Sequence, residues 1–276
     1  MSSIALGLPR TVAYGALGLP VAFAALPVYV YAPKFYATLG LSLGMAGAVL
    51  LFTRVADALI DPWLGRLADR VRARKLFIAA ALTLLAPGLI AMFHPPALGA
   101  DGLALWLAAS VVLATLGYSA AVIAYQAWGA ALGEPFERTR IAAAREGFGL
   151  IGVVLASILP QAFAPTVEAG LPQTTWAFAA ILGACAWATL SMTPARSSAQ
   201  LSETPGEVLK TRAPVLASPR FRGLLAVFAL NGIAAAIPAT LFLFFVADVL
   251  RLESMSGAFL ALYFVAAAAT LPLWVA

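Results

Sequence analysis

Long apolar segments separated by short polar loops dominate the chain. Seven complete apolar segments of bilayer length are predicted, at about 11–32, 43–68, 75–94, 103–131, 141–163, 174–194 and 222–247. An eighth begins near Ser256 and continues to the C-terminal Ala276. Each complete segment holds the roughly 20 residues with which an α-helix crosses about 30 Å of hydrocarbon. The pattern therefore predicts an all-α integral membrane protein.

Composition supports this prediction and excludes several classes of function. Of the 276 residues, 63% are hydrophobic and 11% are charged, and the mean hydropathy is +0.95. A soluble domain carries about 25% charged residues. A single cysteine, Cys185, and a single histidine, His94, exclude a disulfide framework and a Cys-based metal centre. With no nucleophile–base pair and no metal cluster in the sequence, we predict a protein that is not an enzyme and that has no cofactor and no resident metal.

The basic residues predict the orientation of the chain in the membrane. If the N-terminus is cytoplasmic, the cytoplasmic side holds fourteen Lys and Arg residues and the outer loops hold two, Lys34 and Arg251. The cytoplasmic set is Arg10, Arg66, Arg70, Arg72, Arg74, Lys75, Arg138, Arg140, Arg145, Arg196, Lys210, Arg212, Arg220 and Arg222. Because basic loops stay on the cytoplasmic side, we predict a multi-pass protein of the inner (plasma) membrane with its N-terminus inside. The basic residues of the cytoplasmic loops thus explain the net charge of +5, and no nucleic-acid partner is expected.

A change in composition divides the chain. Residues 195–221 are polar, contain three prolines and form the longest predicted cytoplasmic loop. We therefore predict an N-terminal six-helix half at 1–194, a linker at 195–221 and part of a second half at 222–276. A weak internal repeat supports this division, because Pro27, Leu39 and Leu41 match residues 238, 250 and 252 at one constant offset. Pro20, Pro27, Pro33 and Pro238 are expected to bend the first and seventh spans.

The second span carries charges that are costly in a membrane. Arg54, Asp57 and Asp61 lie at positions i, i+3 and i+7 and so share one helix face. The helical rise places Asp57 about 22 Å below the outer end of the span. Three ionisable side chains near the bilayer centre cost about 8–10 kcal/mol on the insertion scale. This face must therefore lie against other helices or a water-filled cavity.

Two interpretations of these charges are open. In one, Arg54 neutralises the carboxylates in a buried network that fixes helix packing. In the other, Asp57 and Asp61 bind a proton or a metal cation, because two carboxylates against one guanidinium leave one negative charge uncompensated. Ionisable residues within membrane spans are usually functional, which favours the second interpretation.

The same stretch resembles a known family of carriers. After the second span, Gly65, Asp69 and Arg70 form the G-x-x-x-D-R inner-loop motif of the major facilitator superfamily. With Arg54, Asp57, Asp61 and Pro62 the string extends to R-x-x-D-x-x-x-D-P-x-x-G-x-x-x-D-R. This string is similar to that of the glycoside–pentoside–hexuronide:cation symporter family, the melibiose permease-like carriers. The resemblance covers essentially the whole chain and implies a twelve-helix bundle, of which about eight helices are present, so that the fold is a truncated one.

The resemblance also implies roles for individual residues. Asp57 and Asp61 match the family's cation-binding aspartates, while Trp128 and Arg145 match residues that help to hold the sugar. Tyr125 lies one helical turn from Trp128, and both could instead be interfacial aromatics. Arg145 could merely neutralise the neighbouring Glu146. Asn231, in the seventh span, could line the cavity or hydrogen-bond a neighbouring helix.

The departures from the family pattern bear on the solute. Pro20 and Ala124 stand where the family has sugar-binding aspartates, so the carboxylate pair that binds pyranosides is absent. Because a proton needs one basic oxygen whereas Na⁺ needs several, H⁺ is favoured over Na⁺ as the coupling ion. We therefore predict a cation-coupled symporter of a small organic solute, such as a sugar or glycoside, monomeric when complete. The alternatives are a carrier of a lipid-like or organic-acid solute and a non-transporting remnant of such a carrier.

Overall fold

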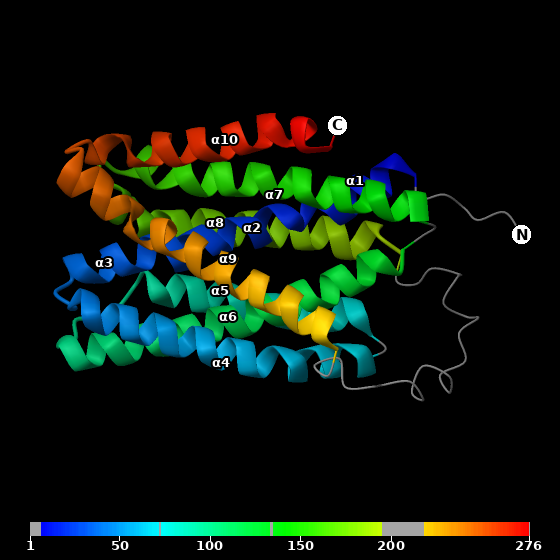
Figure 1. Ribbon diagram of the computed structural model, residues 1–276, viewed down its shortest axis with the longest axis horizontal. Helices are drawn as coiled ribbons and strands as arrows, with labels where there is room; N and C mark the ends of the chain where they lie inside the picture. The colour runs from blue at the N-terminus through cyan, green and yellow to red at the C-terminus, as the bar shows by residue number, and fades with distance from the viewer. Residues whose placement is uncertain (1–6, 72, 133–134, 195–217, 276) are drawn as a thin grey trace, which may run out of the picture.

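The computed structural model describes residues 7–71, 73–132, 135–194 and 218–275, and their secondary structure is helical, with no strand (Figure 1). Eight helical segments among them are long and apolar enough to cross a membrane. They are Leu8–Thr38, Leu43–Arg70, Arg74–Met92, Ala100–Ala130, Glu137–Phe163, Val167–Met192, Pro219–Val249 and Glu253–Thr270. The predicted all-α membrane fold is thereby confirmed. The 195–221 linker lies almost wholly outside the described residues.

The first span is not one regular helix. It consists of α1 (Leu8–Ala16), α2 (Gly18–Leu26), a π-helical turn η1 (Pro27–Tyr31) and α3 (Ala32–Thr38). Proline has no N–H to donate, and η1 begins at Pro27, where the sequence predicted a distortion. The seventh span instead keeps Pro238 inside the regular helix α9 (Pro219–Phe244) and places its π-helical turn η4 later, at Phe245–Val249.

The first six spans form a bundle. α4 (Leu43–Arg70), α5 (Arg74–Met92), α6 (Ala100–Ala130), α7 (Pro135–Phe163) and α8 (Val167–Met192) run alongside the first span (Figure 1). Gly117 of α6 lies so close to α5 that an added Cβ would be 2.5 Å from the backbone nitrogen of Leu85. The glycine therefore lets the two backbones approach closely, as small residues do between membrane helices.

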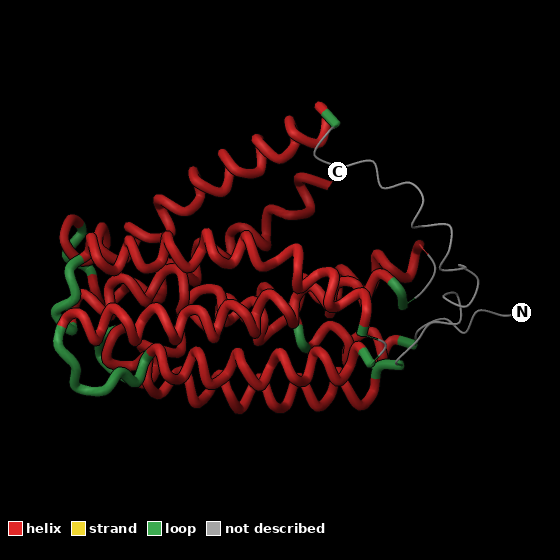
Figure 2. Tube along the Cα trace, turned by 90° about the horizontal axis from the view of Figure 1, so that it is seen from below, coloured by secondary structure: helices red, strands yellow, loops and turns green. Residues whose placement is uncertain are grey.

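The last two spans pack on this bundle unequally. After the short 3₁₀ turn η5 (Glu253–Met255), α10 (Ser256–Val275) lies against α7. α9 contacts the bundle near its C-terminal end, through η1 and α3, and residues 219–238 are exposed. Figure 2 shows this helix diverging from the bundle towards its N-terminal end. α9 thus forms a wall whose main contacts with the described part of the bundle are made by its C-terminal part.

The same backbone feature ends both the first and the seventh span. Gly40 (φ 93°) and Arg251 (φ 56°) are the two residues with positive φ in the described chain. Their separation equals the offset of the internal repeat that Pro27 and Pro238 define. A repeated left-handed turn at matching positions supports the repeat on structural grounds, and glycine adopts that turn more readily than arginine.

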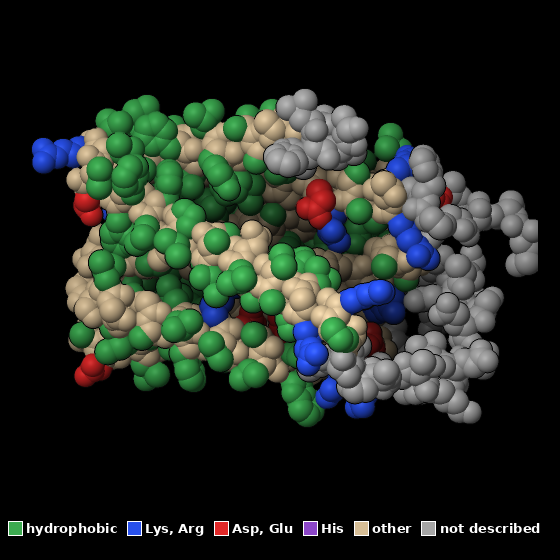
Figure 3. Space-filling model, viewed as in Figure 1, with side chains coloured by type: hydrophobic (Ala, Val, Ile, Leu, Met, Phe, Trp, Pro, Cys, Tyr) green, Lys and Arg blue, Asp and Glu red, His purple; other side chains and the backbone are tan. Residues whose placement is uncertain are grey.

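The charged residues follow the pattern expected of a membrane protein. On the face drawn in Figure 3, Lys and Arg side chains gather at the end of the bundle from which the undescribed segments leave, and hydrophobic side chains cover the sides.

Lys34, expected in an outer loop, lies instead inside α3 and is 8% exposed. Lys34 pairs there with Glu168 and Glu253, and the first span continues to Thr38.

Candidate functional site

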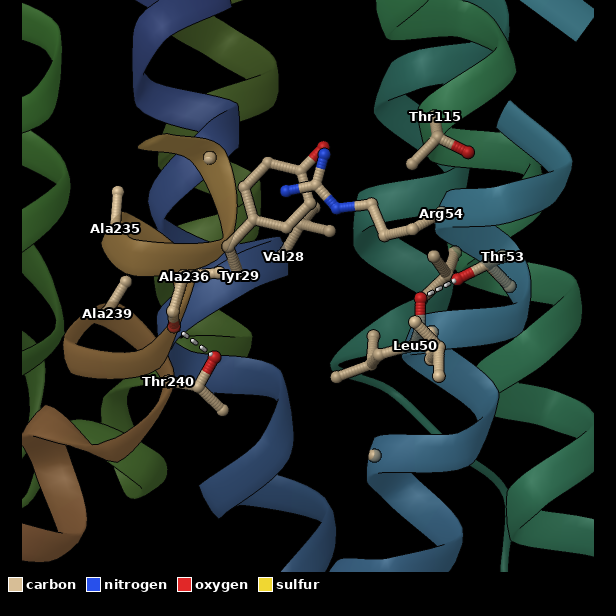
Figure 4. Close-up of a pocket in the computed structure, with 14 residues that line it drawn as sticks. Val28, Tyr29, Leu50, Thr53, Arg54, Thr115, Ala235, Ala236, Ala239 and Thr240 are labelled. Carbon is tan, nitrogen blue, oxygen red and sulfur yellow. Dashed lines mark hydrogen bonds between the residues drawn. The ribbon is translucent and has the colours of Figure 1, made fainter. Parts of the chain in front are cut away.

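A cavity of about 440 Å³ lies between the bundle and α9, beside the part of α4 that ends at Arg54. It is lined from η1 by Val28 and Tyr29, from α4 by Gly47, Leu50, Leu51, Thr53 and Arg54, from α6 by Val111 and Thr115, and from α9 by Gly232, Ala235, Ala236, Ala239 and Thr240. Ligand sites commonly measure 300–1,000 Å³ and have mostly apolar walls with a few polar groups. This cavity has that size and character (Figure 4).

Arg54 is the single charged side chain in the cavity lining. Its guanidinium carbon lies 3.4 Å from the centroid of the Tyr29 ring, in a cation–π contact between α4 and η1 (Figure 4). The contact is worth about 0.5–2 kcal/mol, depending on how far water is excluded. Tyr29 was not among the residues singled out from the sequence, because a contact between the first two spans has no local signature.

The two aspartates of α4 lie beside this cavity and not in its lining. The Oδ1 atom of Asp57 accepts a hydrogen bond from Ser119 Oγ of α6, at 3.1 Å. The Oδ1 atom of Asp61 is buried and has no hydrogen-bond partner among the described residues. Both side chains are half-buried. One carboxylate thus accepts a hydrogen bond from a neighbouring helix, and the other retains a buried oxygen that could accept a proton or bind a cation.

Ser119 is a further candidate that sequence reasoning missed. It is 7% exposed and comes from the middle of the fourth span. One serine in an apolar span gives little signal by itself, since serine hydroxyls often bond to their own helix backbone. Here the hydroxyl is directed at Asp57 instead. Among the described residues no cluster of three or more His, Cys, Asp or Glu could hold a metal ion.

Tyr125 and Trp128 lie in the core of the bundle, away from the cavity lining. Both are 1% exposed. Tyr125 stacks on Tyr14, with ring centroids 4.5 Å apart, and each hydroxyl donates to the other residue's carbonyl oxygen, at 2.6 and 2.8 Å. Trp128 packs edge-on against Tyr14 and donates its Nε1–H to the carbonyl oxygen of Pro194. In this conformation their contacts are those of helix packing.

The remaining candidates are also apart from the cavity. Arg145 donates to Glu146 Oε1 from Nε and Nη2, at 3.1 and 2.6 Å. Asn231 is exposed on α9, next to the lining residue Gly232. The structure therefore brings only Arg54, of the predicted site residues, into the cavity wall, with Asp57 and Asp61 close by on the same helix.

The residues of the predicted inner-loop motif lie at the C-terminal end of α4. Asp69 and Arg70 are exposed, and the helix ends at Arg70. The close helix approach expected at Gly65 is absent, because a Cβ added there would meet nothing within 4 Å in the described part of the chain. No described helix packs against that face of Gly65.

The fold and the site together define a polytopic membrane protein built as a solute carrier is built: apolar helices around a cavity, with ionisable groups of α4 in or near its wall. The model of the family described as "MFS/sugar transport protein" matches residues 13–276. The chain therefore belongs to this family of the major facilitator superfamily, in the melibiose permease-like group. No curated protein matches the chain.

Proposed function

We propose that this protein is a cation-coupled symporter that moves a small organic solute by alternating access. The observation that carries the proposal is the pair of aspartates on α4. Both lie on α4 within two helical turns of the lining residue Arg54, and Asp61 keeps a buried oxygen without a partner among the described residues. A buried carboxylate oxygen without a donor is costly in a low-dielectric environment. A coupling cation at Asp57 and Asp61 would supply the missing partner.

The positions of Arg54, Asp57 and Asp61 favour a role in cation coupling over a role in helix packing alone. A network that only fixed helix packing would pair Arg54 with the carboxylates. Arg54 instead stacks on Tyr29, and the structure gives no ion pair between it and Asp57 or Asp61 in the described residues. Asp57 therefore has Ser119 as a hydrogen-bond donor, and Arg54 acts on it as a nearby positive charge and not as an ion-pair partner.

We propose H⁺ as the coupling ion. The oxygens gathered here are those of two carboxylates and one hydroxyl, and that hydroxyl already donates to Asp57. Hard metal cations prefer larger sets of oxygen ligands, whereas a proton needs one base. Na⁺ coupling is the alternative, and the experiment must distinguish it from H⁺ coupling.

The arrangement of the helices supports alternating access. The cavity has one wall from the six-helix bundle and the other from α9. α9 contacts the bundle at the end where Lys34 pairs with Glu253, and diverges from it towards the other end (Figure 2). A hinge of this kind lets one side of a midplane site open while the other is held closed.

Flux measurements in proteoliposomes test the proposal. The probes are a methyl galactoside and benzoate, which represent the sugar and organic-acid classes of solute. Each is offered under an inward H⁺ gradient, an inward Na⁺ gradient or neither. We expect accumulation under the H⁺ gradient, and its loss in Asp57→Asn. Accumulation that needs neither gradient would contradict coupling, and no accumulation of either probe would favour the non-transporting alternative.

A further inference from the structure

Arg54 is a positive charge placed in an otherwise apolar cavity. The other lining side chains are aliphatic or aromatic, or are threonines whose hydroxyls donate to carbonyl oxygens of their own helices. Thr53 donates to Leu50, Thr115 to Val112 and Thr240 to Ala236, at 3.0, 3.3 and 2.9 Å. Beside the Tyr29 hydroxyl, the guanidinium is therefore the one charged group in the cavity lining that can attract and orient a polar ligand.

The hydrogen-bonding edge of this guanidinium is open. Stacking on Tyr29 occupies a face of the planar group, and its N–H donors, which point outward in the plane, make no hydrogen bond to the described residues. The ion pairs of the described chain join Lys34 to Glu168 and Glu253, and Arg145 to Glu146, so none involves Arg54. Arginine has five N–H donors in a rigid fork, a geometry that matches the two oxygens of a carboxylate.

We propose that the cavity binds a small organic monocarboxylate, with its carboxylate on the Arg54 fork and its apolar body against Leu50, Val111, Ala235 and Ala239. This inference rests on the proposed function and adds the class of solute. One guanidinium compensates one negative charge, which favours a monoanion over a doubly charged phosphate ester. The apolar walls favour an aliphatic or aromatic body over a polyhydroxylated one, since hydroxyl groups would find few free partners there.

The same geometry couples the anion to the cation. Arg54 lies one helical turn from Asp57 and contributes positive charge near both aspartates. When a carboxylate neutralises Arg54, the aspartates lose part of that compensation, and their affinity for a cation rises. By thermodynamic reciprocity, cation binding then strengthens binding of the carboxylate by the same factor. The solute and the coupling ion thus bind as a neutral pair.

Binding to the purified 276-residue protein tests the inference without requiring transport. The probes are benzoate and hexanoate, each with its neutral amide, benzamide or hexanamide, measured by calorimetry in nanodiscs. We expect the carboxylates to bind at least tenfold more tightly than the amides. Arg54→Gln should lose this difference and Arg54→Lys should keep part of it. Arg66→Gln, which removes another arginine of α4 that stacks on Trp63 outside the cavity, should behave as the wild type.

Equal affinity for acids and amides, no binding of either carboxylate, or full affinity in folded Arg54→Gln would overturn the inference. Because the acid–amide comparison is made on the wild type, it stands even if the variants fold poorly. The proposed function is judged separately. Cation-driven accumulation of a neutral solute that depends on Asp57 would keep the symporter proposal and refute the carboxylate. Carboxylate binding without gradient-driven accumulation would keep the carboxylate proposal and refute the symporter proposal.

Discussion

Lys34 Nζ lies 2.6 Å from Glu253 Oε1, although 219 residues separate them in the chain. The same nitrogen lies 3.1 Å from Glu168 Oε1. This cluster joins the first span, the start of the sixth and the turn between the seventh and eighth. Gln161 strengthens the junction, because its Nε2 donates to the carbonyl oxygens of Glu253 and Ser254. One end of the cavity wall is therefore held closed by side chains far apart in sequence.

Breaking the cluster should loosen that end of the molecule. Lys34→Met leaves two carboxylates without their cation, and loss of one partner of a buried polar pair costs about 1–3 kcal/mol. We expect a lower midpoint of thermal unfolding and faster reaction of a cysteine at Ala236, in the cavity wall, with an impermeant thiol reagent added from the outer side. All of these variants are made in Cys185→Ser protein, so that the introduced cysteine is the one thiol that can react. Lys34→Arg, which keeps the charge, is the control, and an unchanged labelling rate in Lys34→Met would refute the closing role.

The orientation can be tested at two described positions on opposite ends of the bundle. In a Cys185→Ser background, Ser254→Cys should react with an impermeant reagent added outside intact cells. Ser218→Cys, which precedes α9, should react only after the membrane has been permeabilised. These expectations follow from the distribution of Lys and Arg between the loops. The opposite labelling pattern would mean that the N-terminus is outside.

The close approach of α5 and α6 predicts an unusual response to glycine substitution. Gly117→Ala places a Cβ 2.5 Å from the Leu85 nitrogen, so the two helices must separate at a cost of about 1–3 kcal/mol. Gly183→Ala is the matched control, because a Cβ there meets no atom within 4 Å and alanine favours the helix. Unfolding in a denaturing detergent should show Gly117→Ala destabilised and Gly183→Ala not. Equal effects of both changes would contradict the packing described.

The Tyr14–Tyr125 pair allows the core and solute-binding roles of Tyr125 to be separated. Each hydroxyl makes one hydrogen bond to a carbonyl oxygen across the α1–α6 contact. Tyr14→Phe and Tyr125→Phe should each cost about 1 kcal/mol of stability. Neither residue lines the cavity, so benzoate affinity should be unchanged. A tenfold loss of affinity in Tyr125→Phe, with stability retained, would instead favour the solute-binding role that the family resemblance implies.

The sequence predicted the spans well because membrane insertion depends on long apolar stretches, which need no knowledge of tertiary contacts. It also identified the polar face of α4, since the cost of three charges in a span is a local property. What it could not predict are contacts between spans. Ser119 meets Asp57, and Tyr29 stacks on Arg54, only after three helices have packed.

A local rule also misled at Gly65. Gly65 was expected to allow close helix packing, yet no described helix approaches it. Pro238 lies inside the regular helix α9, and the π-helical turn of the seventh span lies later, at Phe245–Val249. A glycine or a proline permits a close approach or a bend, but the partner helix decides whether one occurs. By contrast, the matched left-handed turns at Gly40 and Arg251 show that the weak repeat carried real structural information.

The central claim is that Asp57 and Asp61 bind the coupling cation, and infrared spectroscopy of the purified protein measures this most directly. A protonated aspartate has a carboxyl C=O stretching band that its carboxylate form lacks. In a pH titration without Na⁺, we expect a band that disappears as the pH rises and that is reduced in both Asp57→Asn and Asp61→Asn. Asp69→Asn, an exposed residue of the same helix, should leave the band unchanged. If neither site variant alters the titrating band, and Na⁺ has no effect on the wild-type carboxylate bands, the two aspartates do not form a coupling site.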